Sequence, residues 1–232
     1  MCPPSAFGSS DNAATPIPSE TLTSAVPSTT ISKAAFELAA SLLSPAILNH
    51  SLRVFLYAKI LAEKTSSAYF LEPAQLDLLF TACILHDIGT TNQYDGEQRF
   101  EVEGADAAVG LLEQYDIKGK DAHDVWVAIA IHTSPQIAER ISELAKIVRL
   151  AVLFDFNREE GFAEAVKNVD LKSLRAEREN EMPRLGIEKV LGDAVVAQAL
   201  KRPRKAPPAS WPNNLYRAHL AEPEWKGVNK GF

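Results

Sequence analysis

Cysteine and positive charge are both scarce in this chain of 232 residues, which narrows the classes of protein it can form. Its two cysteines, Cys2 and Cys83, provide neither a disulfide framework nor a CxxC metal site, which favours a reducing, intracellular compartment. The 24 basic residues are outnumbered by 30 acidic ones, whereas binding to a phosphate backbone draws on clustered Lys and Arg. We therefore expect a cytoplasmic protein with no nucleic-acid partner.

Long apolar runs are missing as well. No run approaches the ~18 residues that a membrane-spanning helix requires, and the first residues lack the basic and apolar regions of a signal peptide. We expect no membrane partner. The hydrophobic share of 46% is nevertheless what a packed core needs, and the length suits one large domain.

Composition divides the chain into three parts. Residues 1–31 are rich in Ser, Thr, Pro and Ala, which predicts a disordered or loosely packed tail. Residues 32–202 show helical periodicity and no convincing β alternation, which predicts an all-α domain. Residues 203–232 are proline-rich but contain Trp211 and Trp225, which indicates an irregular strap packed on the domain.

The periodicity predicts a series of helices between residues 33 and 201. Pro45, Pro73 and Pro135 each stand where the first turn of a helix tolerates proline. The predicted helices cover residues 33–43, 45–64, 73–88, 101–115, 121–133, 136–156, 160–167, 170–179 and 184–201.

Four ionisable residues interrupt the apolar faces of three predicted helices. His50 falls on the apolar stripe of one helix, the pair His86 and Asp87 ends a second, and Asp155 ends a third. Each residue alone has an ordinary explanation, such as a hydrogen-bonded core histidine or a helix-end carboxylate. Together, two imidazoles and two carboxylates are a donor set suited to one divalent cation, because the carboxylates offset its charge.

In type and order these residues resemble the H…HD…D signature of the HD superfamily, whose members are all-helical, metal-dependent hydrolases. The resemblance covers roughly residues 45–160 and implies an HD-domain helical bundle, here with irregular N- and C-terminal extensions. It also implies that His50, His86, Asp87 and Asp155 all bind one metal ion.

A closer resemblance is to the fungal cyanamide hydratases, zinc-dependent HD enzymes that add water to the nitrile of cyanamide to give urea. The segments that carry it are LHDIGTT (85–91), RFEVEGADAA (99–108), AIAIHTS (128–134) and PASWPNNLYRAHL (208–220). The resemblance implies a zinc-dependent hydro-lyase acting on a small molecule. A related hydratase for another small nitrile-like compound stays open.

The predicted set of four protein ligands bears on the choice of metal. Catalytic zinc usually has three protein ligands, so four leave Mn²⁺ or Fe²⁺ as alternatives to Zn²⁺. The resemblance further implies that Phe100 and Glu101 border the substrate. Their alternative roles are a core side chain for Phe100 and an N-terminal helix charge for Glu101.

His132 is the predicted proton-transfer residue. It lies on the same stripe as Val125 and Ile129 and ends a helix of mostly apolar residues. Thr133, next in the chain, is the other candidate source of the proton. The alternative for His132 is a core histidine that donates a hydrogen bond to a backbone carbonyl group.

Two other functions compete with nitrile hydration. A nucleotide phosphohydrolase needs cations near the metal to hold phosphoryl oxygens, and Arg53 is the nearest obvious one. The HDIG segment is followed by Thr90 and Thr91, where cyclic-dinucleotide phosphodiesterases usually have a lysine. The third candidate is a non-catalytic helical scaffold that keeps a structural metal and binds a partner through its proline-rich ends. Homo-oligomerisation stays open.

Overall fold

The structure, a computed structural model, describes residues 23–232. Within that range the chain forms α-helices and short 3₁₀ helices and no β-strand, which confirms the prediction of an all-α fold. Residues 1–22, most of the predicted N-terminal tail, lie outside the described residues. Thr29, near the end of that predicted tail, caps the first described helix and donates a hydrogen bond of 2.6 Å to Asp77.

The helices follow one another along the chain with short connections. The first group consists of α2 (Thr30–Leu42), α3 (Pro45–Lys64), α4 (Ala68–Leu71), α5 (Pro73–Leu85), η1 (Ile88–Thr90), η2 (Asn92–Tyr94), α6 (Phe100–Gln114), α7 (Lys120–Ala130), α8 (Ala138–Ile141) and α9 (Glu143–Asp155). The second consists of α10 (Glu160–Ala165), α11 (Leu171–Glu181), α12 (Ile187–Lys201), η3 (Pro203–Lys205) and α13 (Trp211–Ala221).

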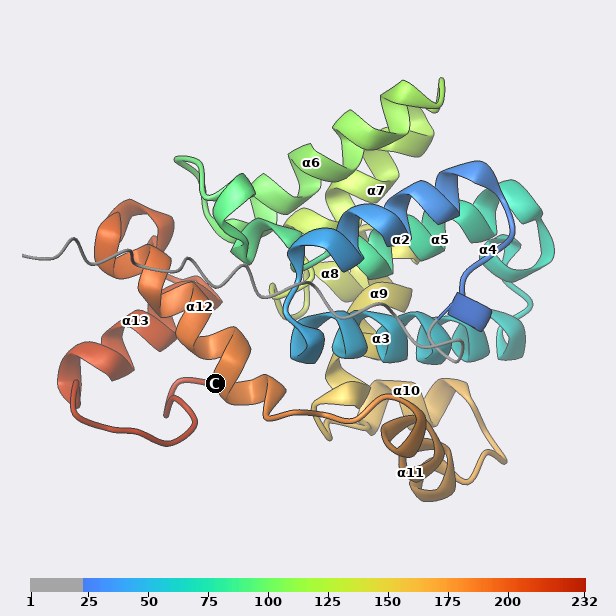
Figure 1. Ribbon diagram of the computed structural model, residues 1–232. Helices are drawn as coiled ribbons and strands as arrows, with labels where there is room; N and C mark the ends of the chain where they lie inside the picture. Colours follow the sequence, from blue (N-terminus) through green and yellow to red (C-terminus); the bar gives the residue numbers. More distant parts are fainter. Residues whose placement is uncertain (1–22) are drawn as a thin grey trace, which may run out of the picture.

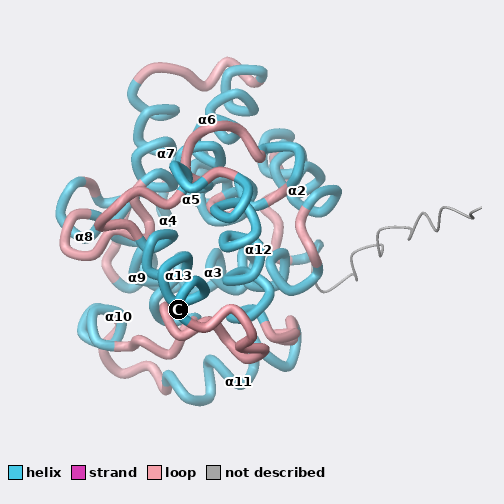
Figure 2. Tube along the Cα trace, turned by 90° about the vertical axis from the view of Figure 1, so that its left-hand side faces the viewer, coloured by secondary structure: helices cyan, strands magenta, loops and turns pink. Residues whose placement is uncertain are grey.

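The central bundle is built from α3, α5, α7 and α9. Helix α3 packs against both α5 and α9, and α7 packs against α5, α6 and α9 (Figure 1). Helices α12 and α13 form a separate layer at one end of this bundle, where α12 contacts α3 and η1 (Figure 2). The connection between α5 and α6 therefore lies between the bundle and the α12–α13 layer.

The helix predicted over residues 136–156 is wrong, because Ser142 divides it into α8 and α9. The backbone of Ser142 is extended (φ −154°, ψ 161°), and its hydroxyl accepts a hydrogen bond from the backbone nitrogen of Ala145. Such a side-chain N-cap satisfies one of the unpaired amides of the new helix, so a helix starts there readily. Ile137, the N-cap of α8, and Ile141, its last residue, are 57% and 55% exposed.

The prediction that residues 203–232 are irregular is wrong for residues 211–221, which form α13. Ser210 caps this helix by accepting a hydrogen bond from the amide of Asn213, and Pro212 stands in the first turn. Proline likewise stands in the first turn of α3 and of α5. Leu215 is fully buried and anchors α13 to the domain.

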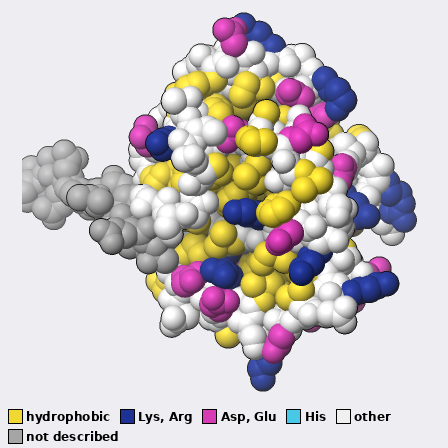
Figure 3. Space-filling model, turned by 90° about the vertical axis from the view of Figure 1, so that its right-hand side faces the viewer, with side chains coloured by type: hydrophobic (Ala, Val, Ile, Leu, Met, Phe, Trp, Pro, Cys, Tyr) yellow, Lys and Arg dark blue, Asp and Glu magenta, His cyan; other side chains and the backbone are white. Residues whose placement is uncertain are grey.

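Charged side chains of both signs are interspersed on the face seen in Figure 3. None of the helices in the described range combines the length and apolar character needed to cross a membrane.

Candidate metal centre and adjoining cavity

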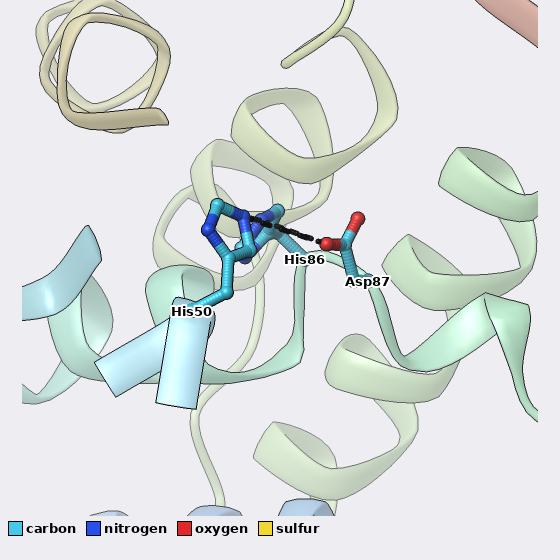
Figure 4. A group of neighbouring side chains, drawn as sticks. All are labelled: His50, His86 and Asp87. Atoms are coloured by element: carbon cyan, nitrogen blue, oxygen red, sulfur yellow. Dashed lines mark hydrogen bonds and ion pairs between the residues drawn. The ribbon is translucent and has the colours of Figure 1, made fainter. Parts of the chain in front are cut away.

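Three of the four residues predicted to bind a metal meet inside the domain. His50 lies in the second turn of α3, His86 is the C-cap of α5, and Asp87 follows in the turn to η1. Their side chains converge in Figure 4, and one donor atom of each lies within 4.8 Å of the other two. The two Nε2 atoms are 3.2 Å apart, and Oδ2 of Asp87 is 3.6 Å from that of His50 and 3.3 Å from that of His86.

Gly89 allows the turn that carries Asp87 to approach the start of α6. A Cβ atom at Gly89 would lie 2.0 Å from the carbonyl oxygen of Phe100 and 2.8 Å from the backbone nitrogen of Gly104, so no larger residue fits. The carbonyl oxygen of Gly89 accepts a hydrogen bond of 2.9 Å from Gln198 in α12. The turn is thus fixed from two sides.

The hydrogen bonds of the two imidazoles leave both Nε2 atoms as acceptors. His86 donates through Nδ1 to the carbonyl oxygen of Cys83, and His50 donates through Nδ1 to Oδ2 of Asp155, each at 2.7 Å. An imidazole that carries its proton on Nδ1 presents a lone pair on Nε2. Two lone pairs therefore face each other at 3.2 Å beside the carboxylate of Asp87. The two lone pairs repel each other, and a cation between them would attract both. Metal-bound histidines typically donate a hydrogen bond through the other ring nitrogen, as both Nδ1 atoms do here.

Asp87 gives a second indication of a cation. Its carboxylate is buried, and neither oxygen has a hydrogen-bond partner among the described residues. A buried carboxylate without a partner is costly, so a missing cation is the natural explanation. Burial raises the pKa of Asp87, but His86 and His50 outweigh it and hold that pKa below its ordinary value. Burial lowers the pKa of His50. An ionised carboxylate and a neutral imidazole are the forms that bind metal.

Asp155, predicted as a fourth ligand, lies on the far side of His50 and is turned away from the cluster. Arg53 donates through Nε and Nη2 to its two oxygens at 2.7 Å each, and His50 occupies Oδ2 as well. Burial raises the pKa of Asp155, but the hydrogen bonds from Arg53 and His50 bring it well below its ordinary value. With both oxygens engaged, Asp155 orients His50 in this geometry, and its role as a fourth ligand stays a prediction.

His132 lies just past the end of α7 and faces the metal cluster. Its Nδ1 donates to the carbonyl oxygen of Ile129 at 2.7 Å, and its Nε2 is 3.6 Å from Oδ1 of Asp87. Burial and the charge of His86 lower the pKa of His132 to about 3. His132 is therefore neutral and presents the lone pair of Nε2 to the site. The hydrogen bond to a backbone carbonyl and the position beside the site, weighed as alternatives from the sequence, are both found.

Thr133 and Glu101 are linked at the wall of the site. Thr133 donates to Oε1 of Glu101 at 2.7 Å, and Arg99 donates to the hydroxyl of Thr133 at 3.1 Å. Thr133 lines the adjoining cavity, whereas neither Glu101 nor Phe100 does. In this geometry Glu101 supports Thr133, and Phe100 packs behind His132 with a ring separation of 5.8 Å. Their role beside the substrate stays a prediction.

A cavity of about 580 Å³ opens from the metal cluster toward α13. Its polar end holds the cluster together with His132 and Thr133. The sequence analysis identified none of the other side chains that line it. These include Val152, Leu153, Phe156, Arg149, Arg158, Leu191, Trp211, Asn214 and Phe232. Of these, Trp211 and Asn214 carried a signal, because they lie in the segment 208–220 that contributed to the family resemblance.

Residues 47–153, which contain the buried His-His-Asp cluster, match the sequence model of the HD domain family. Two cyanamide hydratases of Saccharomyces cerevisiae (strain ATCC 204508 / S288c), DDI2 and DDI3, are each 32% identical to the chain over 122 residues. The match covers 51% of this chain and 53% of each relative, so the chain spans about half the length of the curated relatives it matches. The predicted resemblance to the HD superfamily, close to the cyanamide hydratases, is confirmed.

Proposed function

We propose that this protein is a metal-dependent hydratase that adds water to the nitrile of cyanamide to give urea. The observation that carries the proposal is the buried cluster of His50, His86 and Asp87, which opens into a cavity beside His132 and Thr133. The similarity to two cyanamide hydratases supports the choice of reaction.

His50, His86 and Asp87 would hold the cation. Three protein ligands are the usual number at catalytic zinc, so the geometry favours Zn²⁺ over the Mn²⁺ or Fe²⁺ that a fourth ligand left open. A divalent cation bound there supplies a nucleophile at neutral pH, because it lowers the pKa of a bound water to ~7. Asp155 and the carbonyl oxygen of Cys83 keep the two imidazoles oriented.

Nitrile hydration forms a bond from the water oxygen to the nitrile carbon and moves a proton to the nitrile nitrogen. His132 accepts a proton from the attacking water through the lone pair of Nε2 and returns it to that nitrogen, so the residue ends each cycle neutral. Thr133 donates a hydrogen bond from its hydroxyl group to Glu101. The hydroxyl oxygen can therefore act as the acceptor for a hydrogen bond from the amino group of the substrate.

The cations near the cluster argue against a phosphohydrolase. Arg53 is engaged with Asp155 and with the carbonyl oxygen of Met182 at 2.8 Å. Arg149 lines the cavity but donates to the carbonyl oxygen of His132 and pairs with Glu139. Neither Arg53 nor Arg149 is therefore free to hold a phosphoryl group in the way that phosphoryl transfer requires.

The test compares two activities on protein loaded with Zn²⁺, Mn²⁺ or Fe²⁺. Metal content is measured by mass spectrometry, urea release is assayed with cyanamide, and phosphate release is assayed with a set of nucleotides. We expect about one equivalent of bound metal per chain, urea formation, and little phosphate release. Phosphate release without urea formation would replace the proposal with a nucleotide phosphohydrolase, and bound metal with neither product would favour a structural metal.

A further inference from the structure

Seven rings form a closed circuit of contacts at the cavity. Neighbouring centroids are separated by 4.7 to 6.0 Å, within the ~4.5–7 Å of interacting aromatic pairs. In order around the circuit the rings are His50, Phe156, Phe232, Trp211, Phe100, His132 and His86. The three histidines form the polar end. Phe156, Trp211 and Phe232 also line the cavity, with Phe156 next to His50, and we call these three residues the aromatic wall.

The cavity is far larger than cyanamide requires. Cyanamide has three non-hydrogen atoms and occupies about the volume of two water molecules, each ~30 Å³ in the liquid. The cavity volume of about 580 Å³ lies instead in the ~300–1,000 Å³ range of sites that enclose drug-sized ligands. Most of this space adjoins apolar side chains, because Val152, Leu153 and Leu191 extend the aromatic wall. Such a surface favours an apolar group over bulk water.

Phe232 is held in the wall by contacts of its own segment. Asn229 donates to the carbonyl oxygen of Leu215 at 3.0 Å and accepts from the amide of Gly231 at 2.8 Å. A Cβ atom at Gly231 would lie 2.5 Å from the carbonyl oxygen of Asn214, so the close approach to α13 requires glycine. The ring of Phe232 then packs on Phe156 at 5.0 Å and on Trp211 at 5.3 Å. The side chain is thus positioned by the fold.

We propose that the substrates of this site include nitriles that carry a flat apolar substituent, with aryl cyanamides as the representative class. The inference rests on the proposed hydratase function and extends its substrate. The nitrile points to the metal end, and the aryl ring lies against Phe156, Trp211 and Phe232. Water adds across the nitrile as it does in cyanamide, so phenylcyanamide and one water give phenylurea with no other reactant.

The experiment compares cyanamide with phenylcyanamide in the metal-loaded parent protein and in Phe232→Ala. In the parent we expect a KM for phenylcyanamide roughly 10- to 100-fold below that for cyanamide, the worth of burying one aromatic ring. Phe232→Ala should raise the KM for phenylcyanamide about tenfold more than it raises the KM for cyanamide, because Phe232 contacts the rings of the wall and no residue of the metal cluster. Phe232→Leu, which keeps apolar volume, should fall between the two.

Trp225→Ala is the matched control, because Trp225 belongs to the same segment but is 51% exposed and outside the cavity. It should leave the preference for phenylcyanamide unchanged. A second readout is the binding of phenylcyanamide to metal-free protein by titration calorimetry, which does not depend on turnover. Cyanamide hydration without binding or hydration of phenylcyanamide would overturn the aryl inference and leave the hydratase function standing.

Turnover of neither compound would overturn the hydratase function. The aryl site would then be supported by saturable binding of phenylcyanamide that weakens in Phe232→Ala, and overturned by the lack of such binding.

Discussion

Asp155 accepts a hydrogen bond of 2.7 Å from Nδ1 of His50, on the side of the imidazole away from His86. The same carboxylate accepts two hydrogen bonds from Arg53, so in this geometry the residue predicted as a fourth ligand orients the first one. Partners of this kind typically contribute 10- to 100-fold to metal affinity.

This arrangement predicts different outcomes for two carboxylate variants. Asp155→Asn should weaken metal binding by about 10- to 100-fold. It should not abolish binding, because the amide oxygen of Asn still accepts the hydrogen bond from His50. Asp87→Asn should abolish tight binding. Competition with a chromophoric chelator measures both, and equal losses in the two variants would make Asp155 a direct ligand.

Removing the Asp155 side chain should also lower the free energy of unfolding. Asp155→Ala leaves the guanidinium group of Arg53 fully buried without its carboxylate partner, which typically costs about 3–5 kcal/mol. Urea denaturation of the metal-free protein isolates this effect from metal loss. A change below about 1 kcal/mol in the free energy of unfolding would contradict the buried ion pair.

The metal should contribute to stability through the cluster alone. A chelator should lower the Tm of the parent protein, because an ion that binds only the folded chain stabilises it. His86→Ala should start from the lower Tm and show no further shift. His123→Ala, at an exposed position on α7, serves as the control and should keep both the metal and the shift. An equal chelator response in His86→Ala and the parent would place the metal elsewhere.

His132 separates catalysis from metal binding. Since its Nδ1 is committed to Ile129 and its Nε2 faces Asp87, His132→Ala should keep the metal and lower kcat by about 10²–10⁴. His132→Asn should stay slow if proton transfer is the role. If His132→Ala retains the parent rate, His132 serves only in packing. If the variant loses the metal, His132 either binds the metal or positions a residue that does.

Asp95 predicts a pH-dependent stability far from the metal. It pairs with Lys205 at 3.0 Å and Arg202 at 2.9 Å, and these partners outweigh burial and lower its pKa. A carboxylate with a lowered folded-state pKa stabilises the protein above its unfolded value of ~3.9, and that stability is lost as the pH falls through the folded pKa.

Asp95→Asn should therefore cost about 1–3 kcal/mol at pH 7, with the difference from the parent shrinking below about pH 4. Denaturation curves across this range measure it. Asp116→Asn removes an exposed ion pair to Lys118 and should have almost no effect at any pH. A difference between Asp95→Asn and the parent that does not change with pH would show that charge is not its source.

The sequence was sufficient for the helical class and for the three residues that meet at the cluster. His50, His86 and Asp87 stood out because ionisable groups on apolar faces need a partner. The role of Asp155 could not be predicted, because a carboxylate at a helix end suits a cation or an arginine equally and spacing does not give the orientation of a side chain. Only the three-dimensional structure shows that Arg53 donates to both oxygens of Asp155.

Other features depend on where helices stop. His86, Asp87 and His132 lie just past the ends of α5 and α7, so helical periodicity brought attention to them without describing their geometry. The start of α13 was missed, although Ser210 and Pro212 are recognisable helix-start signals in the sequence. Phe232 has no such signal, because its position depends on the reversal of residues 222–232 onto α13.

The closing wall of the cavity has a consequence for biosynthesis. The metal cluster is complete once Asp87 has been made, whereas the aromatic wall needs Phe232, 145 positions later in the numbering. Domains emerge from the ribosome N-terminal part first, at ~5–20 residues per second. A nascent chain therefore possesses its metal donors for several seconds before it can form the aromatic wall.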